Sequence, residues 1–172
     1  MIILFFGPVA SGKSTIARMV AERLPGSYVL TSDMFRRRTY SRLIREVARL
    51  KDTYRYLIVD GTFYKRRWRE ELRKAVRGTP MLEAYVHCSL ETCLRRNRER
   101  GSPVPERAVR IVWSEFEPPE MPDVEVDTDR LNAEQAALVV LSLVRAFSTL
   151  GGRSAKSWTA GSRWPSPSGL LV

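Results

Sequence analysis

The chain of 172 residues is poor in the residue types that most often hold zinc or form disulfide frameworks. It contains two cysteines, Cys88 and Cys93, and one histidine, His87. The cysteines lack the CxxC or Cys/His spacing of zinc sites. We therefore expect neither a structural zinc nor a disulfide framework, and we expect the three side chains to belong to the folded core. Free thiols fit a reducing compartment, the cytoplasm.

Long apolar runs and an N-terminal leader are also missing. A transmembrane helix needs about 18 or more consecutive apolar residues, and the sequence has no such run. We expect no membrane partner. The chain starts in the apolar run Ile2–Phe6, without a basic leader or a small-residue cleavage site. A secretory signal peptide is therefore not expected.

Acidic residues are scarce in the first two thirds of the chain. Residues 1–112 contain 24 Lys or Arg against 11 Asp or Glu, a net charge of +13. Residues 113–150 have a net charge of −6, and the last 22 residues add +3, which gives the total of +10. A basic region of this size favours an anionic ligand, either a nucleotide or a nucleic acid. An arginine-rich surface that is simply solvated is the alternative.

Five apolar runs alternate with stretches that have the spacing of amphipathic helices. The predicted strands are residues 1–6, 28–31, 56–60, 81–88 and 124–127. The predicted helices are residues 14–24, 40–51, 65–77, 90–100, 106–116 and 132–147. This alternation predicts an α/β protein with an open, mainly parallel five-stranded sheet and helices on both faces. Residues 1–148 are expected to form one domain, and residues 149–172 a mobile, basic tail rich in Ser, Gly and Pro.

The segment between the first predicted strand and helix, Gly7–Ser14, matches the pattern GxxxxGK[ST]. Glycines let successive main-chain N–H groups point at phosphate oxygens, and the following helix adds its positive end. The lysine reaches the β- and γ-phosphates, and the serine hydroxyl binds Mg²⁺. We therefore expect ATP and Mg²⁺ as cofactors and a P-loop NTPase fold of the nucleoside-kinase-like type. The residues expected to hold the nucleotide are Gly7, Ala10, Ser11, Gly12, Lys13, Ser14 and Thr15.

Two carboxylates, Asp33 and Asp60, follow the second and third predicted strands. Ligands of open parallel sheets bind beyond the carboxyl ends of the strands. We expect Asp33 to orient or deprotonate an acceptor hydroxyl, and Arg36 to bind an anionic part of the acceptor. Asp60 is expected to bind Mg²⁺ through water or to position the acceptor. Each carboxylate has a structural alternative, because Asp33 can cap a helix and Asp60 can form a turn with Gly61.

Arginine-rich segments follow the third and fourth predicted strands. In the first, Arg67 and Arg69 are candidates to line the acceptor pocket, although most charges of a helix there must face solvent. In the second, residues 95–105, Arg96 and Arg100 share a helix face. We expect these two arginines to form a mobile lid that closes over the γ-phosphate and excludes water. A solvated basic helix or a nucleic-acid patch is the alternative. The expected catalytic residues are thus Lys13, Asp33, Arg96 and Arg100.

Over residues 1–147 the chain resembles the small P-loop kinases that act on polynucleotide 5′-hydroxyls, adenylylsulfate or seryl-tRNA(Sec). Asp33–Arg36 looks like the Asp-x-x-Arg of the polynucleotide and adenylylsulfate kinases, which implies a general base and an arginine on acceptor phosphate. Residues 96–105 are similar to the lid of polynucleotide and seryl-tRNA kinases, which implies that Arg96 and Arg100 engage the ATP phosphates. Phe116–Asp123 resembles the adenylylsulfate kinase segment before the last strand. The long lid of true adenylylsulfate kinases and the tRNA-binding region of seryl-tRNA kinases are missing.

Resemblance and charge together predict an ATP-dependent kinase. Its acceptor is expected to be a hydroxyl of an anionic nucleotide- or RNA-linked molecule, with adenylylsulfate as the alternative. Two further alternatives belong to other classes of protein. One is a nucleotide-dependent binding or regulatory protein in tRNA modification. The other is a nucleic-acid binder whose basic face matters more than catalysis.

Overall fold

A computed structural model of the chain describes residues 1–35, 37–101 and 103–149. Arg36 and almost all of the predicted tail lie outside the described residues. The strands are β1 (Ile2–Phe6), β2 (Ser27–Thr31), β3 (Tyr56–Asp60), β4 (Met81–His87) and β5 (Val124–Asp127). The helices are α1 (Lys13–Glu22), α2 (Thr39–Leu50), α3 (Arg66–Ala75), α4 (Leu90–Arg98), α5 (Glu106–Ser114) and α6 (Ala133–Thr149). A short 3₁₀ helix, η1 (Ser32–Met34), follows β2.

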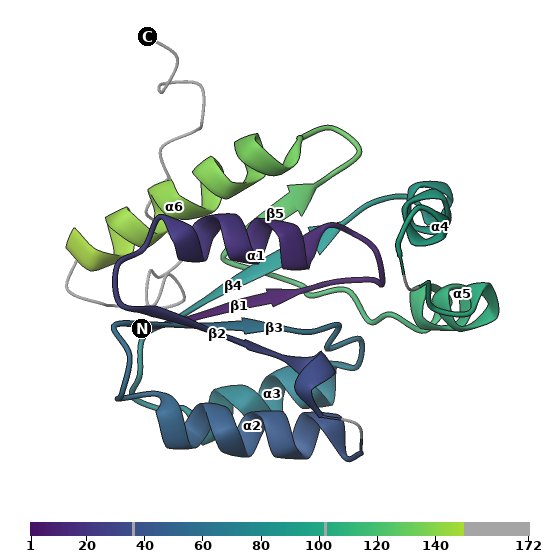
Figure 1. Cartoon of the computed structure of the whole chain (residues 1–172). Coiled ribbons are helices and arrows are strands. Elements are labelled where there is room, and N and C mark those ends of the chain that lie inside the picture. Colours follow the sequence, from purple (N-terminus) through teal and green to yellow (C-terminus); the bar gives the residue numbers. More distant parts are fainter. Residues whose placement is uncertain (36, 102, 150–172) are drawn as a thin grey trace, which may run out of the picture.

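The five strands form one parallel sheet in the order β2-β3-β1-β4-β5. Helices α1 and α6 cover one face, and α2 and α3 cover the other (Figure 1). Helices α4 and α5 lie beyond the carboxyl ends of the strands (Figure 1). The predicted α/β fold is confirmed, and every described strand pair is parallel. No helix among the described residues is long and apolar enough to cross a membrane.

Strand β1 occupies the middle of the sheet, and all five of its residues are fully buried. Ile3 and Phe5 belong to the core under α1 and α6, whereas Ile2, Leu4 and Phe6 belong to the core under α2 and α3. A continuous apolar run is typical of a parallel strand covered on both faces. Because β1 is packed from both sides, the loop that leaves its carboxyl end starts from a fixed position.

The order of the strands creates a crevice at the carboxyl end of β1. The chain passes from β1 to β2 at one edge of the sheet, whereas β4 lies on the other side of β1. Such a reversal of strand order is the point where open α/β sheets bind their ligands. The segments that follow β1, β2, β3 and β4 meet at this crevice, and most of the polar residues singled out in the sequence lie on them or at the end of β3.

Candidate nucleotide and acceptor site

The loop Gly7–Gly12 between β1 and α1 has the backbone of a phosphate-binding loop. Gly7, Ala10 and Gly12 have positive φ angles of 152°, 62° and 93°. Gly12 stands immediately before α1 and has no side chain with which to cap it. The first main-chain N–H groups of the helix are therefore not occupied by a side-chain cap and can bind a ligand in the crevice. A side chain on Gly7 would place its Cβ 1.8 Å from the carbonyl oxygen of Val86 in β4. The position therefore requires glycine for space as well as for its backbone conformation.

Substitution of Gly7 by alanine is expected to lower the free energy of unfolding by about 3 kcal/mol, because the Cβ forces β4 away from the loop. Gly78 is a matched control, since it also has a positive φ (86°) but a Cβ added there would have no neighbouring atom within 4 Å. Gly78→Ala should cost only about 1 kcal/mol of backbone strain. Chemical denaturation of both variants measures the difference. Equal losses would contradict a clash at Gly7.

Lys13 is a buried cation at the start of α1. Its side chain is 9 % exposed, and Nζ donates to the carbonyl oxygen of Pro8 at 3.3 Å. Burial lowers the pKa of Lys13, the carboxylates of Asp60 and Asp33 oppose that shift, and the charge of Arg100 adds to it. The charges of Asp60, Asp33 and Arg100, which come from three different segments, therefore all act on the ammonium group of Lys13.

Asp60 ends β3 and is also buried, with 7 % exposure. Burial raises the pKa of Asp60, while Lys13 and a hydrogen bond from the Ser14 hydroxyl lower it. The Oδ1 atom of Asp60 and the Oγ atom of Ser11 are buried and have no hydrogen-bond partner among the described residues. Unpartnered buried oxygens are rare and point to a missing ligand. A hydroxyl and a carboxylate side by side are oxygen donors that suit Mg²⁺, so Ser14 and Asp60 fit the predicted metal.

A cavity of about 500 Å³ lies over the loop and connects most of the predicted residues. On its acceptor side it is lined by Ser32, Asp33, Asp60 and Thr62, and on its other side by Arg96, Glu99, Arg100 and Val104. Between these walls lie Val9, Ala10, Gly12, Lys13, Ser14, Thr15 and Arg18. The structure therefore brings Asp33, Asp60, Arg96 and Arg100 to one site around the loop.

Asp33 lies in η1, and its carboxylate is free to face the cavity. Its own N–H donates to Oγ1 of Thr31 at 3.0 Å, so Thr31 and not Asp33 caps this turn. Asp33 is exposed and lines the cavity opposite the phosphate-binding loop. The capping role that the sequence left open for Asp33 is thus filled by its neighbour.

The structure does not bring Arg67 to the cavity. Its side chain is exposed on α3, with the guanidinium 4.6 Å from the centre of the Trp68 ring. Arg69 is only 1 % exposed and donates to the carbonyl oxygens of Phe63 at 2.6 Å and Glu117 at 2.7 Å. Burial lowers the pKa of Arg69. Arg69 is therefore an internal support that joins the loop after β3 to the segment before β5.

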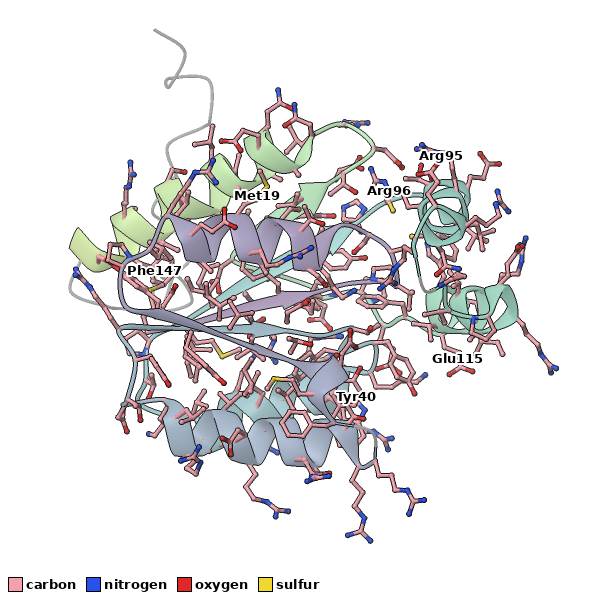
Figure 2. The ribbon with its side chains drawn as sticks, in the orientation of Figure 1. Met19, Tyr40, Arg95, Arg96, Glu115 and Phe147 are labelled. Carbon is pink, nitrogen blue, oxygen red and sulfur yellow. The ribbon has the colours of Figure 1, made fainter. Side chains whose placement is uncertain are left out.

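The arginines of the predicted lid lie at different depths. Figure 2 shows Arg96 on the side of α4 that faces α1, with Arg95 pointing away from it. The Arg96 guanidinium donates to Oγ1 of Thr128 at 2.8 Å and to its carbonyl oxygen at 2.9 Å. It stands close to Gly12, whereas the charge of Arg100 acts on Lys13. The segment thus presents both arginines to the cavity, with Arg96 beside Gly12 and the charge of Arg100 acting on Lys13.

Two supporting residues of the site were not predicted. Buried Asn97 holds the backbone of Val104 by two hydrogen bonds, of 2.7 and 3.0 Å, and so closes the loop that contains Arg100. Buried Thr128, directly after β5, donates its hydroxyl to the carbonyl oxygen of Ser11 at 2.9 Å. A polar residue at the carboxyl end of the fifth strand was the available signal for Thr128. Asn97 had no comparable signal, because its partners are main-chain atoms.

A second hollow of about 560 Å³ adjoins the first across Gly12 and Arg96. Its remaining wall comes from the turn between β5 and α6, including Thr128, Asp129 and Asn132. The two hollows share Gly12, Thr15 and Arg96. A ligand that lies along the phosphate-binding loop can therefore extend into both of them.

This geometry at the end of β1 places the chain among the P-loop kinases. More particularly, the chain belongs to the AAA domain family, whose model matches residues 2–119. An adenylyl-sulfate kinase of Geotalea uraniireducens is 29 % identical over 89 % of this chain and 84 % of its own length. A probable adenylyl-sulfate kinase of Halalkalibacterium halodurans is 31 % identical over 84 % of this chain and 83 % of its own. An L-seryl-tRNA(Sec) kinase of Methanococcus maripaludis is 26 % identical over 74 % of this chain and 59 % of its own length.

Solved structures share the fold. The crystal structure of APE1195 has a TM-score of 0.69 and 28 % identity and covers 85 % of this chain and 95 % of its own. The APS kinase of Mycobacterium tuberculosis in complex with AMPPNP and APS has a TM-score of 0.67 and 22 % identity. The match covers 84 % of this chain and 96 % of that kinase. The predicted family resemblance is confirmed, and the chain is an ATP-dependent kinase, as its sequence predicts.

Proposed function

We propose that the chain transfers the γ-phosphoryl group of ATP to a hydroxyl of an anionic, nucleotide- or RNA-linked acceptor. The observation that carries this proposal is the set of charges around Lys13. Asp60, Asp33 and Arg100 come from three separate segments, line one cavity with Lys13, and all act on its ammonium group. A site for phosphoryl transfer needs such cations at the transferred group and a carboxylate at the attacking oxygen.

Each residue has a distinct role in the proposed reaction. The amides of residues 7–12 and Lys13 hold the β- and γ-phosphates. Asp33 orients the acceptor hydroxyl and accepts its proton as the oxygen attacks. Arg100, which lies near Lys13, neutralises charge that develops on the transferred group. Arg96, held on Thr128 beside Gly12, serves the part of the nucleotide that extends toward the second hollow.

Ser14 and Asp60 are the residues proposed to hold Mg²⁺, directly or through water. When bound, the ion neutralises phosphate charge and orients the phosphate chain. The buried, unpartnered Oδ1 of Asp60 and the hydrogen bond between Ser14 and Asp60 support this assignment. Residues 1–148 are proposed to contain the whole catalytic unit.

A row of arginines on α2 supports an acceptor that extends beyond the cavity. Arg42 and Arg45 are exposed, three positions apart on one face of the helix, and exposed Arg38 stands immediately before its first residue. An ion pair on this helix joins Arg49 to Glu46, and none of the other three arginines has an ion-pair partner among the described residues. The row begins five residues after Asp33. It therefore leads away from the proposed reaction centre and suits the phosphates of a polynucleotide.

A labelled-ATP screen tests the proposed function. The full chain is incubated with γ-labelled ATP and, in turn, adenylylsulfate, 5′-hydroxyl RNA, 5′-hydroxyl DNA and aminoacylated tRNA. Label on a nucleic-acid hydroxyl supports the proposal. Label on adenylylsulfate alone establishes the second candidate, which the two adenylyl-sulfate kinase relatives favour. ATP binding without transfer to any acceptor would point to the third candidate, a nucleotide-dependent regulatory protein.

Reversal of charge in the arginine row is expected to weaken RNA binding selectively. Arg42→Glu with Arg45→Glu should reduce affinity for a 10-nucleotide RNA by about tenfold or more at low salt, and should lower the salt dependence by roughly 0.7 per lost phosphate contact. Lys74→Glu with Arg107→Glu changes the charge equally at exposed positions on α3 and α5 and is the control. Filter binding over a salt series measures both. An equal loss in the control would contradict a specific track on α2.

A further inference from the structure

The two cysteines of the chain lie against each other beneath the nucleotide site. Cys88 directly follows β4, and Cys93 lies in the first turns of α4. Their Sγ atoms are 3.1 Å apart and share a hydrogen bond. Both are free thiols, with exposures of 5 % and 0 %, and they pack against Leu94 and Val109. The sequence predicted that both cysteines lie in the core, which is confirmed, but it did not predict that they are neighbours. Two thiols at this distance can react with each other after oxidation.

The two thiols differ in reactivity. The hydrogen bond from Cys93 lowers the pKa of Cys88 against the effect of burial, and the charge of Arg96 contributes in the same direction. The same hydrogen bond and burial raise the pKa of Cys93. The thiolate is the reactive form of cysteine. Cys88, which also retains slight exposure, is therefore the more nucleophilic of the two, and Cys93 is placed to attack it once it is oxidised.

The pair is connected to the phosphate-binding loop through Thr128. Thr128 donates to the carbonyl oxygen of His87, the residue before Cys88, from its main-chain N–H at 2.9 Å and from its hydroxyl at 3.2 Å. The same hydroxyl donates to the carbonyl oxygen of Ser11 and accepts from Arg96 at 2.8 Å. Arg96 lies three residues after Cys93 on the same helix. A shift of Cys88 thus reaches the loop through His87 and Thr128, and a shift of Cys93 moves the helix that contains Arg96.

We propose that Cys88 and Cys93 form an oxidation site for hydroperoxides, and that the resulting disulfide weakens nucleotide binding. The Cys88 thiolate attacks a peroxide oxygen, the O–O bond breaks, and protonation of the leaving oxygen gives water and a sulfenic acid on Cys88. The Cys93 sulfur then attacks the Cys88 sulfur, and its proton leaves with the sulfenic hydroxyl as a second water. In sum, two thiols and one hydrogen peroxide give one disulfide and two waters.

Disulfide formation changes the geometry around Thr128. The sulfurs must approach by about 1 Å, because an S–S bond is about 2.05 Å long. The movement draws the end of β4, where the His87 carbonyl accepts hydrogen bonds from Thr128, toward the first turn of α4. Thr128 then shifts with β4, and its hydrogen bonds to Arg96 and to the Ser11 carbonyl weaken. We expect the ATP dissociation constant to rise by about tenfold, within the range usual for coupled sites.

The test uses the full chain and two readouts, neither of which depends on the acceptor. After treatment with hydrogen peroxide, unreacted thiols are alkylated and the tryptic peptide 78–95, which contains both cysteines and ends at Arg95, is weighed. ATP–Mg²⁺ affinity is measured by calorimetry on the same samples. We expect the peptide to lose both alkylation sites together, the affinity to fall, and dithiothreitol to restore both.

Single serine variants provide the controls. Cys88→Ser and Cys93→Ser keep a small hydrogen-bonding side chain, and each should bind ATP like the reduced wild type whether or not peroxide was added. Loss of alkylation at Cys88 alone, with Cys93 still reactive, would overturn the proposed disulfide. A disulfide that leaves ATP affinity unchanged would overturn the coupling. If the serine variants fold poorly, the reversal by dithiothreitol in the wild type decides the question. Failure of the proposed phosphoryl transfer would leave these readouts unaffected.

Discussion

Replacement of Asp33 by asparagine is expected to slow phosphoryl transfer by about 10²–10⁴-fold, the usual contribution of a general base. Asparagine has nearly the same shape and still offers an oxygen to the acceptor hydroxyl, but it cannot take the proton. Because the side chain is exposed and the turn is capped by Thr31, the fold should be preserved within about 0.5 kcal/mol. Affinity for ATP should change little, because the loop after β1 provides the phosphate contacts.

Single-turnover transfer and calorimetric ATP binding separate these two effects. Asp52→Asn is the matched control, because Asp52 is an exposed aspartate that forms a 3.8 Å ion pair with Lys51 on the surface. The control should transfer phosphate like the wild type. Unchanged transfer in Asp33→Asn would remove the aspartate from the reaction. A weakened ATP affinity with normal transfer at saturation would assign Asp33 to nucleotide binding instead.

Replacement of Lys13 by methionine is expected to lower transfer by about 10²–10³-fold, since preorganised charge at a transferred group typically contributes this much. The effect on folding should be small. Burial already disfavours the charged ammonium, as the lowered pKa of Lys13 shows, so its removal relieves a desolvation cost while Asp60 loses a neighbouring cation. These two contributions oppose each other, so we expect the loss of stability to stay below the roughly 3–5 kcal/mol that removal of one partner of a buried ion pair costs.

Transfer assays and thermal melts of Lys13→Met are compared with those of Lys74→Met, which removes an exposed lysine from α3. The control should keep full activity. A large loss of thermal stability in Lys13→Met alone would mean that the lysine acts mainly as the counter-ion of Asp60. Full activity in Lys13→Met would contradict the role of the ammonium group in the transfer itself.

Local patterns in the sequence were sufficient to predict the fold and the centre of the site. The apolar run 1–6 correctly predicted a strand, β1, and the amphipathic spacing of residues 40–51 correctly predicted α2, whose buried residues are Leu43, Ile44, Val47 and Leu50. The motif Gly7–Ser14 needed only its immediate neighbours to be interpreted. Because parallel strands end at a common edge, the positions of Asp33 and Asp60 along the chain were enough to assign both to the same crevice.

Contacts between distant segments could not be predicted. Thr128 holds the Ser11 carbonyl across 117 positions of sequence, and no local pattern marks that pairing. Arg67 and Arg69 looked alike in a basic helix, yet one stacks on Trp68 in solvent and the other lies inside the protein. Only the packing of α3 against its neighbours separates the two.

The two hydrogen bonds between Asn97 and Val104 have a consequence for the entropy of nucleotide binding. A flexible flap must be ordered anew each time substrate arrives, and the entropy lost in that step subtracts from binding. Here the amide side chain of Asn97 joins the backbone of Val104 to α4 in the folded protein, so the freedom of Val104 is already lost before ATP arrives. Val104 lines the cavity, so this part of its wall is ordered without drawing on the free energy of nucleotide binding.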